Sequence, residues 1–317
     1  MARILVTGGA GFIGSHLIAA LIADGQDVRV LDDLSTGKRA NLPDEVTLIE
    51  GDVADPVAVA AAMAGVDGCF HLAAIASVER GVQDWLGTHR VNQTGTITVL
   101  DAARARPGMR AQAVPVVYAS SAAVYGDAPD LPITEATPAR PLSAYGADKL
   151  GSELHARVAA HGHGVPAVGL RFFNVYGPRQ DPLSPYSGVI SIFCERLLRA
   201  APLRIYGDGG QSRDFIYVAD VVAALRAAMA RAQAGATRPG EAFNVCSGIA
   251  TRIDALAAVI ARLCGTVPEI QHAPGRSGEI RHSLGSRAKA EAALGLAAPA
   301  ALATGLAATL AWMRQAQ

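Results

Sequence analysis

The chain of 317 residues is poor in cysteine, with only Cys69, Cys194, Cys246 and Cys264, and no two of these form a C-x-x-C pair. Cysteines so widely separated are not typical of a disulfide framework or a zinc-binding motif. We therefore expect reduced, mostly buried thiols and no metal ion.

The chain also lacks net charge, since 28 basic residues balance 28 acidic ones. This balance argues against nucleic acid or an anionic membrane as the main partner, although a few local arginines would suffice for a small anionic molecule. No apolar run is long enough to span a bilayer, and the Ala-rich stretches 57–64 and 298–312 are periodic like packing helices. Because residue 3 already belongs to an apolar strand pattern, no signal peptide is expected and the expected compartment is the cytoplasm.

Half of the residues are hydrophobic, which is ample for one large domain or two coupled domains. Short β-branched runs alternate with helical patterns through the first half of the chain. The runs are 3–7, 28–31, 46–50, 67–71, 114–119 and 165–171, and the helical patterns are 15–23, 55–64, 84–106 and 144–161. Such alternation predicts an α/β fold with a doubly wound parallel sheet of the Rossmann type.

Past Arg171 the regular alternation ends. A turn-rich segment at 177–182 is followed by a helix near 189–200, a strand and helix within 214–231, a strand at 242–245, and then mainly helix with one short strand. We predict a cofactor domain of residues 1–172, to which 214–247 return. Residues 173–213 and 248–317 form a smaller, mostly helical substrate domain.

The strongest cofactor signal is the glycine-rich segment between the first strand and the first helix. Gly8 makes a tight turn, Gly11 lets the backbone approach a pyrophosphate, and Gly14 lets the helix pack on the strand. The helix N-terminus supplies amide donors for phosphate oxygens. A doubly wound domain that binds another nucleotide, or none, is the alternative.

Asp32 ends the second strand, where an acid accepts hydrogen bonds from the adenosine ribose. A carboxylate there repels a 2′-phosphate, so NAD is favoured over NADP, although Arg39 lies close in sequence.

The candidate catalytic groups come later in the chain. Tyr145 and Lys149 are spaced so that they share one face of a helix, and an ammonium near a phenol favours the phenolate. Together with the Ser121 hydroxyl, these two residues could remove a proton from an alcohol as a general base. The alternative is that Tyr145 and Lys149 simply belong to a solvent-exposed helix face.

These motifs occur in a longer ordered series. It comprises T-G-G-A-G-F-I-G (7–14), L-D-D-L-S (31–35), G-D-V (51–53), H-L-A-A (71–74), S-S-A-A-V-Y-G (120–126), Y-G-A-D-K (145–149), R-F-F-N-V-Y-G-P (171–178) and R-D-F-I-Y-V-A-D (213–220). Over essentially its whole length the chain resembles the extended short-chain dehydrogenases/reductases, and within them the UDP-hexose 4-epimerases.

The resemblance implies a role for each matching residue. The cofactor contacts it implies, beside the three glycines, are Phe12, Ile13, Asp32, Asp33, Leu34, Ser35, Asp52, Val53, Leu72, Ala73, Ala74, Tyr145 and Lys149. Tyr145 is then the base, Lys149 the ligand of the nicotinamide ribose and Ser121 the catalytic hydroxyl. Asn174, Tyr206, Arg213 and the pair Arg276 and Glu279 would bind the uridine diphosphate, and guanidinium groups suit phosphate geometry in any case. A homodimer formed through helices in 84–106 and 144–161 is also implied.

Two positions bear on the reaction. Family members that eliminate or decarboxylate carry acids just after the catalytic hydroxyl, whereas this chain has Ala122 and Ala123, which cannot transfer protons. Ser283 matches a position where epimerases restricted to plain hexoses carry a tyrosine, so a 2-acetamido group would fit. Ser77 could donate a hydrogen bond to that amide, although either serine can equally be a satisfied loop hydroxyl.

We therefore expect NAD-dependent 4-epimerisation of UDP-N-acetylglucosamine and UDP-N-acetylgalactosamine, and also of UDP-glucose and UDP-galactose, through a 4-keto sugar, with NAD kept as a prosthetic group. Three alternatives stay open. They are another nucleotide-sugar reaction (4,6-dehydration or epimerisation of UDP-glucuronate), net oxidation or reduction with exchangeable NAD(P)H, and a regulator that binds NAD(H) without turnover.

Overall fold

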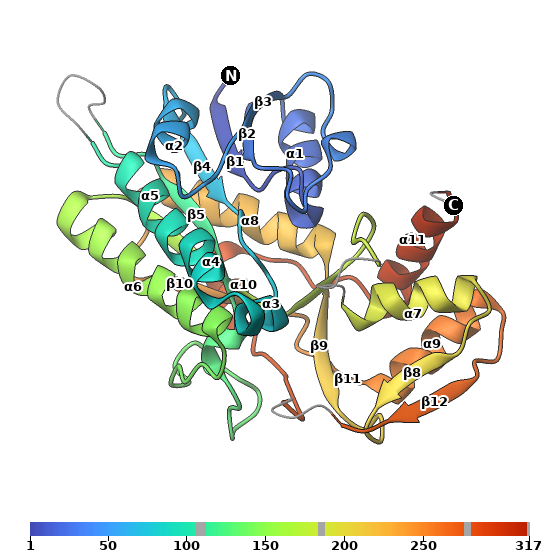
Figure 1. Ribbon diagram of the computed structural model, residues 1–317. Coiled ribbons are helices and arrows are strands. Elements are labelled where there is room, and N and C mark those ends of the chain that lie inside the picture. The colour runs from blue at the N-terminus through green and yellow to red at the C-terminus, as the bar shows by residue number, and fades with distance from the viewer. Residues whose placement is uncertain (106–111, 183–187, 276–279, 316–317) are drawn as a thin grey trace.

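A seven-stranded parallel sheet forms the centre of the computed structural model, which describes residues 1–105, 112–182, 188–275 and 280–315 (Figure 1). The strand order is β10-β6-β5-β4-β1-β2-β3. The bounds are β1 Arg3–Thr7, β2 Asp27–Asp32, β3 Thr47–Glu50, β4 Gly68–His71, β5 Val116–Ser121, β6 Ala167–Phe172 and β10 Ala242–Val245. The doubly wound Rossmann sheet is thus confirmed, with the reversal of strand order between β1 and β4.

Helices cover both faces of this sheet. On one face lie α1 (Phe12–Ala23) and α8 (Val218–Gln233), which contact each other, and on the other lie α2 (Pro56–Met63), α5 (Gly95–Ala102) and α6 (Ala144–His163) (Figure 1). Strand side chains alternate between the two layers: Ile4 and Val6 belong to one buried cluster, and Leu5 belongs to the other. Burial on both faces is why these strands read as continuous apolar runs.

The helix predicted over 84–106 is instead a broken one. Two short helices, α3 (Val78–Gln83) and α4 (Trp85–His89), precede a π turn at Arg90–Thr94, and α5 follows. Asn92 lies in the π turn, where its side chain bonds both backbone groups of Ile75 at 2.8 and 3.2 Å. The irregular turn therefore fixes the loop that leaves β4.

The smaller unit contains two small sheets as well as helices. β7 (Asn174–Tyr176), β9 (Ser212–Tyr217) and β11 (Ala250–Arg252) form one sheet, and β8 (Leu203–Tyr206) pairs with β12 (Ile270–Ala273). α7 (Val189–Leu198), α9 (Ile253–Cys264) and α11 (Leu302–Gln315) complete its core. Past residue 250 the sequence predicted one short strand, whereas the chain forms β11 and β12. Both are short and poor in the alternation that marks a strand.

The chain crosses between the two units more than once. β9 belongs to the small three-stranded sheet, while α8 and β10 return to the large sheet. α10 (Ala288–Leu294) returns again and packs on α8 and β10. Asp214, fully buried in β9, accepts hydrogen bonds from the backbone of Ser247, Gly248 and Gly285 and so ties these passages together.

None of the four cysteines forms a disulfide within the described part of the chain, and Cys69, Cys194 and Cys246 are buried, as expected. Within the described part of the chain, every helix is too short or too polar to cross a bilayer.

Candidate active site

A cleft of about 1220 Å³ opens at the carboxyl ends of the parallel strands. Its walls include Gly8 after β1, Asp32 at the end of β2, Leu72 after β4, Ser121 at the end of β5 and Phe173 after β6. Ligands of doubly wound sheets bind at this edge, because the loops converge there.

The glycine turn forms one wall and leaves no room for larger residues. Gly8 has a φ of +70°, and a Cβ there would lie 2.6 Å from the Ala73 nitrogen. A Cβ on Gly14 would lie 2.3 Å from the Gly8 oxygen. The first turn of α1 has no side-chain cap, and its residues Phe12 and Ile13 line the cleft. Uncapped amides behind a side-chain-free turn fit the pyrophosphate of a dinucleotide.

Asp32 has a structural role in addition to the predicted one. Its two carboxylate oxygens accept backbone hydrogen bonds from Ala10 and Leu34, both at 2.9 Å. Burial raises the pKa of Asp32, while those two hydrogen bonds oppose the rise. A carboxylate has about four acceptor sites, so Asp32 can hold the turn and still accept ribose hydroxyls. The neighbouring Asp33 accepts bonds from the backbone and the hydroxyl of Ser35.

The structure brings almost the whole predicted cofactor set together. Leu34 does not line the cleft. Gly8, Gly11, Phe12, Ile13, Gly14, Asp32, Asp33, Ser35, Asp52, Val53, Leu72, Ala73, Ala74, Tyr145 and Lys149 do. Asp52 is held by Arg90, whose guanidinium lies 2.6 Å from its carboxylate. Arg90, from the π turn, was not anticipated in this wall.

The candidate catalytic groups come from β5 and the start of α6. Ser143 caps α6, since its hydroxyl accepts the Gly146 amide at 3.1 Å. A Cβ on Gly146 would lie 2.6 Å from the Ala123 oxygen, so this glycine lets α6 approach the end of β5. The Lys149 ammonium is buried, donates to the Ala119 oxygen at 2.9 Å, and lies 5.8 Å from the centre of the Tyr145 ring.

We expected Lys149 to lower the pKa of Tyr145. Among the groups of the protein itself this expectation is wrong, because the pKa of Tyr145 is raised. Burial raises the pKa of the Tyr145 phenol, and a hydrogen bond with Ser121 only opposes that rise. Burial also lowers the pKa of Lys149 to about 8, against the opposing charge of Asp148. The Lys149 ammonium lies over the Tyr145 ring and donates to a backbone carbonyl, and burial remains the largest influence on the pKa of both groups.

A buried polar network behind Ser121 escaped the sequence prediction. Arg171 donates to both carboxylate oxygens of Glu153, at 2.8 and 2.6 Å, and to the Tyr125 hydroxyl at 2.7 Å. Glu153 also accepts from the Ser120 hydroxyl, and Tyr125 donates to Asn244 at 2.6 Å. The network joins β5, β6, β10 and α6 and fixes the strand end that carries Ser121.

A second buried chain of hydrogen bonds lies under the glycine turn. His71 bonds the Thr7 hydroxyl at 2.8 Å and the Thr96 hydroxyl at 3.0 Å. Thr96 in turn donates to the Asn92 oxygen, so His71 donates through Nε2 and accepts through Nδ1. Neutral His71 thereby links β1, β4 and α5.

Fewer of the predicted substrate residues than of the predicted cofactor residues line the cleft. Asn174 and Ser121 line the cleft. Ser77 is buried and caps α3, since its hydroxyl accepts the Arg80 amide at 3.0 Å, which matches the simple loop-hydroxyl alternative. Arg276 and Glu279 lie outside the described residues.

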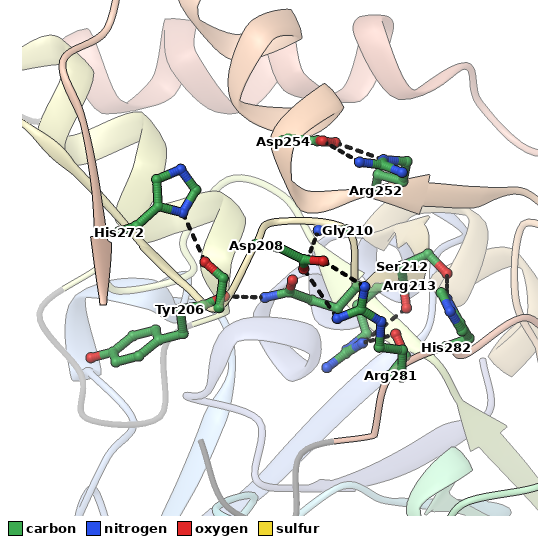
Figure 2. A network of polar contacts seen from close by, with 12 residues as sticks. Tyr206, Asp208, Gly210, Ser212, Arg213, Arg252, Asp254, His272, Arg281 and His282 are labelled. Carbon is green, nitrogen blue, oxygen red and sulfur yellow. Dashed lines mark hydrogen bonds and ion pairs between the residues drawn. The ribbon is translucent and has the colours of Figure 1, made fainter. Parts of the chain in front are cut away.

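Tyr206, Arg213 and Ser283 lie in the smaller unit and do not line the cleft. Arg213 donates to the backbone oxygens of Ser212 and Arg281, and the Ser283 amide donates to Ser212 at 3.1 Å. Figure 2 shows Ser212 and Arg213 near a two-bond ion pair between Arg281 and Asp208, with the Tyr206 ring pointing away from that pair. The structure therefore gathers Arg213 and Ser283 around Ser212, at the segment that follows Glu279.

Several other residues of the cleft wall were not anticipated. Lys38, Arg179, Gln180 and Asp181 lie in it, and the Gln180 side-chain oxygen is buried without a hydrogen-bond partner among the described residues. Three of them belong to the turn-rich segment 177–182, which the sequence shows, but nothing in its composition indicates that it lines the cleft.

Known proteins resemble this chain closely. Residues 4–246 match the family model described as the NAD dependent epimerase/dehydratase family. A UDP-glucose 4-epimerase of Mycolicibacterium smegmatis is 38% identical over 286 residues, or 86% of each chain. The solved UDP-glucose 4-epimerase of Thermotoga maritima with UDP-glucose is 34% identical over 99% of each chain, with a TM-score of 0.92. A UDP-N-acetylglucosamine 4-epimerase from Methanobrevibacter ruminantium, in complex with UDP-N-acetylmuramic acid, is 32% identical over 100% of this chain and 99% of that one, with a TM-score of 0.91.

Proposed function

This chain belongs to the NAD dependent epimerase/dehydratase family and is an NAD-dependent UDP-sugar 4-epimerase, and we propose that it interconverts UDP-N-acetylglucosamine and UDP-N-acetylgalactosamine, and also UDP-glucose and UDP-galactose. One observation carries the mechanism. Ser121, Tyr145 and Lys149 line the same cleft as the glycine turn, so a proton acceptor and a dinucleotide site face one space.

Tyr145 takes the proton from the sugar 4-hydroxyl, and Ser121 holds the phenol and the sugar oxygen in line through hydrogen bonds. When held by the glycine turn and Asp32, NAD would supply the hydride acceptor for C4 and a positive charge that favours the phenolate. Lys149, fixed by Ala119, presents its ammonium to this end of the cleft. The same tyrosine returns the proton when the 4-keto sugar is reduced on its opposite face.

The alanines after Ser121 support epimerisation over elimination. Ala122 and Ala123 begin a 3-10 helix (Ala122–Tyr125), where an acid would be needed to protonate a leaving group. The intact Ser121, Tyr145 and Lys149 set also argues against a regulator without turnover, because a sensor needs no base.

Acceptance of the N-acetylated sugar rests on Ser283. Ser283 bonds Ser212, next to Arg213, and does not line the cleft, so the support comes from the resemblance: where epimerases restricted to plain hexoses carry a tyrosine, this small side chain would leave room for a 2-acetamido group. We assign the diphosphate and uridine to Asn174, Tyr206, Arg213, Arg276 and Glu279, within a substrate unit of residues 173–213 and 248–317. The cytoplasmic location stays a prediction.

A homodimer is part of the proposal. Apolar side chains stand exposed on the helices named for the interface: Trp85 is 67% and Leu86 83% exposed in α4, and Leu154 is 56% and Val158 59% exposed in α6. α4 and α6 contact each other, so the four side chains lie on neighbouring helices. A second copy covering them would remove this surface from water. A monomer in sedimentation equilibrium at micromolar concentration would refute the dimer.

The experiment that tests the function supplies the purified protein with UDP-N-acetylglucosamine and UDP-glucose in parallel and separates the products by chromatography. We expect both 4-epimers, with no added cofactor. Tyr145→Phe should reduce turnover by at least about a hundredfold, the usual contribution of a general base, while NAD content and circular dichroism stay unchanged. Undiminished turnover by this variant would exclude Tyr145 as the base, and a 6-deoxy-4-keto product would replace epimerisation with dehydration.

A further inference from the structure

Among the described residues, three contacts fasten the segment Pro178–Asp181, here called the strap, to the cofactor unit. His16 Nε2 bonds the Pro178 oxygen at 2.8 Å, Arg179 donates to the Ser15 oxygen at 3.1 Å, and the Lys38 ammonium lies 2.7 Å from the Asp181 carboxylate. The strap follows β7 of the small sheet, whereas its three partners belong to α1 and to the loop after β2. The contacts therefore join the substrate unit to the cofactor unit.

The strap lies in the wall of the same cleft as the glycine turn. Arg179 and Asp181 line the cleft together with Gly11 and Phe12. The His16 ring packs edge to face on Phe12, with ring centres 5.9 Å apart. On the opposite side, the Lys38 amide donates to the Ala10 oxygen at 3.0 Å. The His16 and Lys38 contacts of the strap are thus each linked to the glycine turn or to the residue that follows it.

The backbone of the strap is held in an uncommon conformation. Arg179 has a φ of +66°, in the left-handed region that side chains other than glycine rarely adopt. Such a conformation persists only where the surroundings impose it, and here the Arg179 side chain, the Pro178 carbonyl and the Asp181 carboxylate are all anchored. The shape of the strap thus depends on its fastening to the cofactor unit.

We propose that the strap is a clasp that retains NAD between catalytic cycles, and that the Lys38–Asp181 ion pair is the link that opens for exchange. Lys38 is 61% and Asp181 34% exposed, so water and salt reach this link, whereas the other two contacts are more buried. An epimerase regenerates its cofactor every turn, and a clasp that slows release serves that chemistry. The inference rests only on the NAD dependence of the proposed function, not on the sugar preference.

The test measures NAD release from the holoenzyme without any sugar, by dilution followed by rapid desalting and assay of the NAD still bound. Lys38→Ala and Asp181→Asn should each release NAD about two- to fivefold faster, the range of an exposed ion pair. The reversed pair, Lys38→Asp with Asp181→Lys, should return toward the wild-type rate. Raising the salt from about 50 to about 500 mM should speed release from the wild type and not from either single variant.

The variant Asp181→Asn distinguishes two explanations of NAD retention, a clasp and simple charge attraction. Removing a negative charge from the cleft would slow the loss of an anionic dinucleotide if attraction alone held it, whereas opening a clasp speeds that loss. Arg226→Ala is the matched control, since it breaks a comparably exposed ion pair with Asp24 in which neither residue lines the cleft. Its NAD release should equal that of the wild type.

Slower or unchanged release from Asp181→Asn would overturn the clasp, and so would equal acceleration by Arg226→Ala. A protein that retains NAD as described but converts neither UDP-sugar would refute the proposed function and leave the clasp standing. A protein that epimerises both sugars while the variants release NAD at the wild-type rate would refute the clasp alone.

Discussion

Removal of the Glu153 carboxylate should destabilise the protein strongly, because it leaves the Arg171 guanidinium buried and partly unpaired. The two side chains are 9% and 11% exposed and share two charge-assisted hydrogen bonds. Breaking one partner of such a buried pair costs about 3–5 kcal/mol. An unfolding entropy of about 2.1 cal/mol/K per residue gives about 1.5 °C per kcal/mol for 317 residues, so Glu153→Ala should lower the melting temperature by about 4–8 °C.

The assay is thermal unfolding followed by circular dichroism, with Asp254→Ala as the control. Asp254 and Arg252 also share two hydrogen bonds, but their side chains are 40% and 60% exposed, so this loss should stay below about 1 kcal/mol. Because Glu153 also holds Ser120, next to Ser121, turnover of Glu153→Ala should fall even well below its melting temperature. Equal melting temperatures for the two variants would refute the reasoning that burial decides the cost.

Three further outcomes are expected. Ser283→Tyr should abolish turnover of the N-acetylated pair and keep that of UDP-glucose and UDP-galactose; survival of both pairs, measured by chromatography, would contradict the size argument. Gly14→Ala, whose Cβ would lie 2.3 Å from the Gly8 oxygen, should leave the purified protein without NAD, as measured by the absorbance of the released nucleotide. Gly162→Ala is the control, because open space surrounds Gly162, and it should keep the wild-type NAD content. Burial lowers the pKa of His71 to about 3, whereas the pKa of histidine in the unfolded chain is near 6.5. Between about pH 3 and about pH 6.5, His71 is therefore protonated in the unfolded chain and neutral in the folded protein. The free energy of unfolding should therefore fall by about 1.4 kcal/mol per pH unit below about pH 6.5, and urea titrations of His71→Gln should show a shallower fall; identical slopes would exclude His71 as the group responsible.

What the sequence predicted well is what depends on neighbours along the chain. The glycine turn, the acid at the end of β2 and the Tyr145–Lys149 spacing are local patterns, and each reached the expected place in the cleft. Helix existence was also predictable from periodicity, except where the π turn interrupts 84–106, because such a turn has no period of its own.

What the sequence could not predict depends on residues that meet only after folding. Glu153 and Arg171 come from α6 and β6, and Lys38 meets Asp181 across two units. No spacing rule connects such pairs. The pKa of Tyr145 was mispredicted for a related reason, because helical spacing gives the distance to Lys149 but not the depth of burial, and burial proved the larger effect.

The double use of Asp32 has a consequence for any attempt to redesign cofactor preference. A route toward NADP would replace this acid with a small or basic residue, but the same carboxylate receives the amides of Ala10 and Leu34. Removing this carboxylate leaves the two backbone amides without their acceptor and destabilises the glycine turn, which any dinucleotide cofactor needs. Asp33, by contrast, accepts its hydrogen bonds from the nearby Ser35 within the described part of the chain, so its charge can be altered with less damage to the turn. At Asp32, selectivity and architecture are carried by one side chain and must change together.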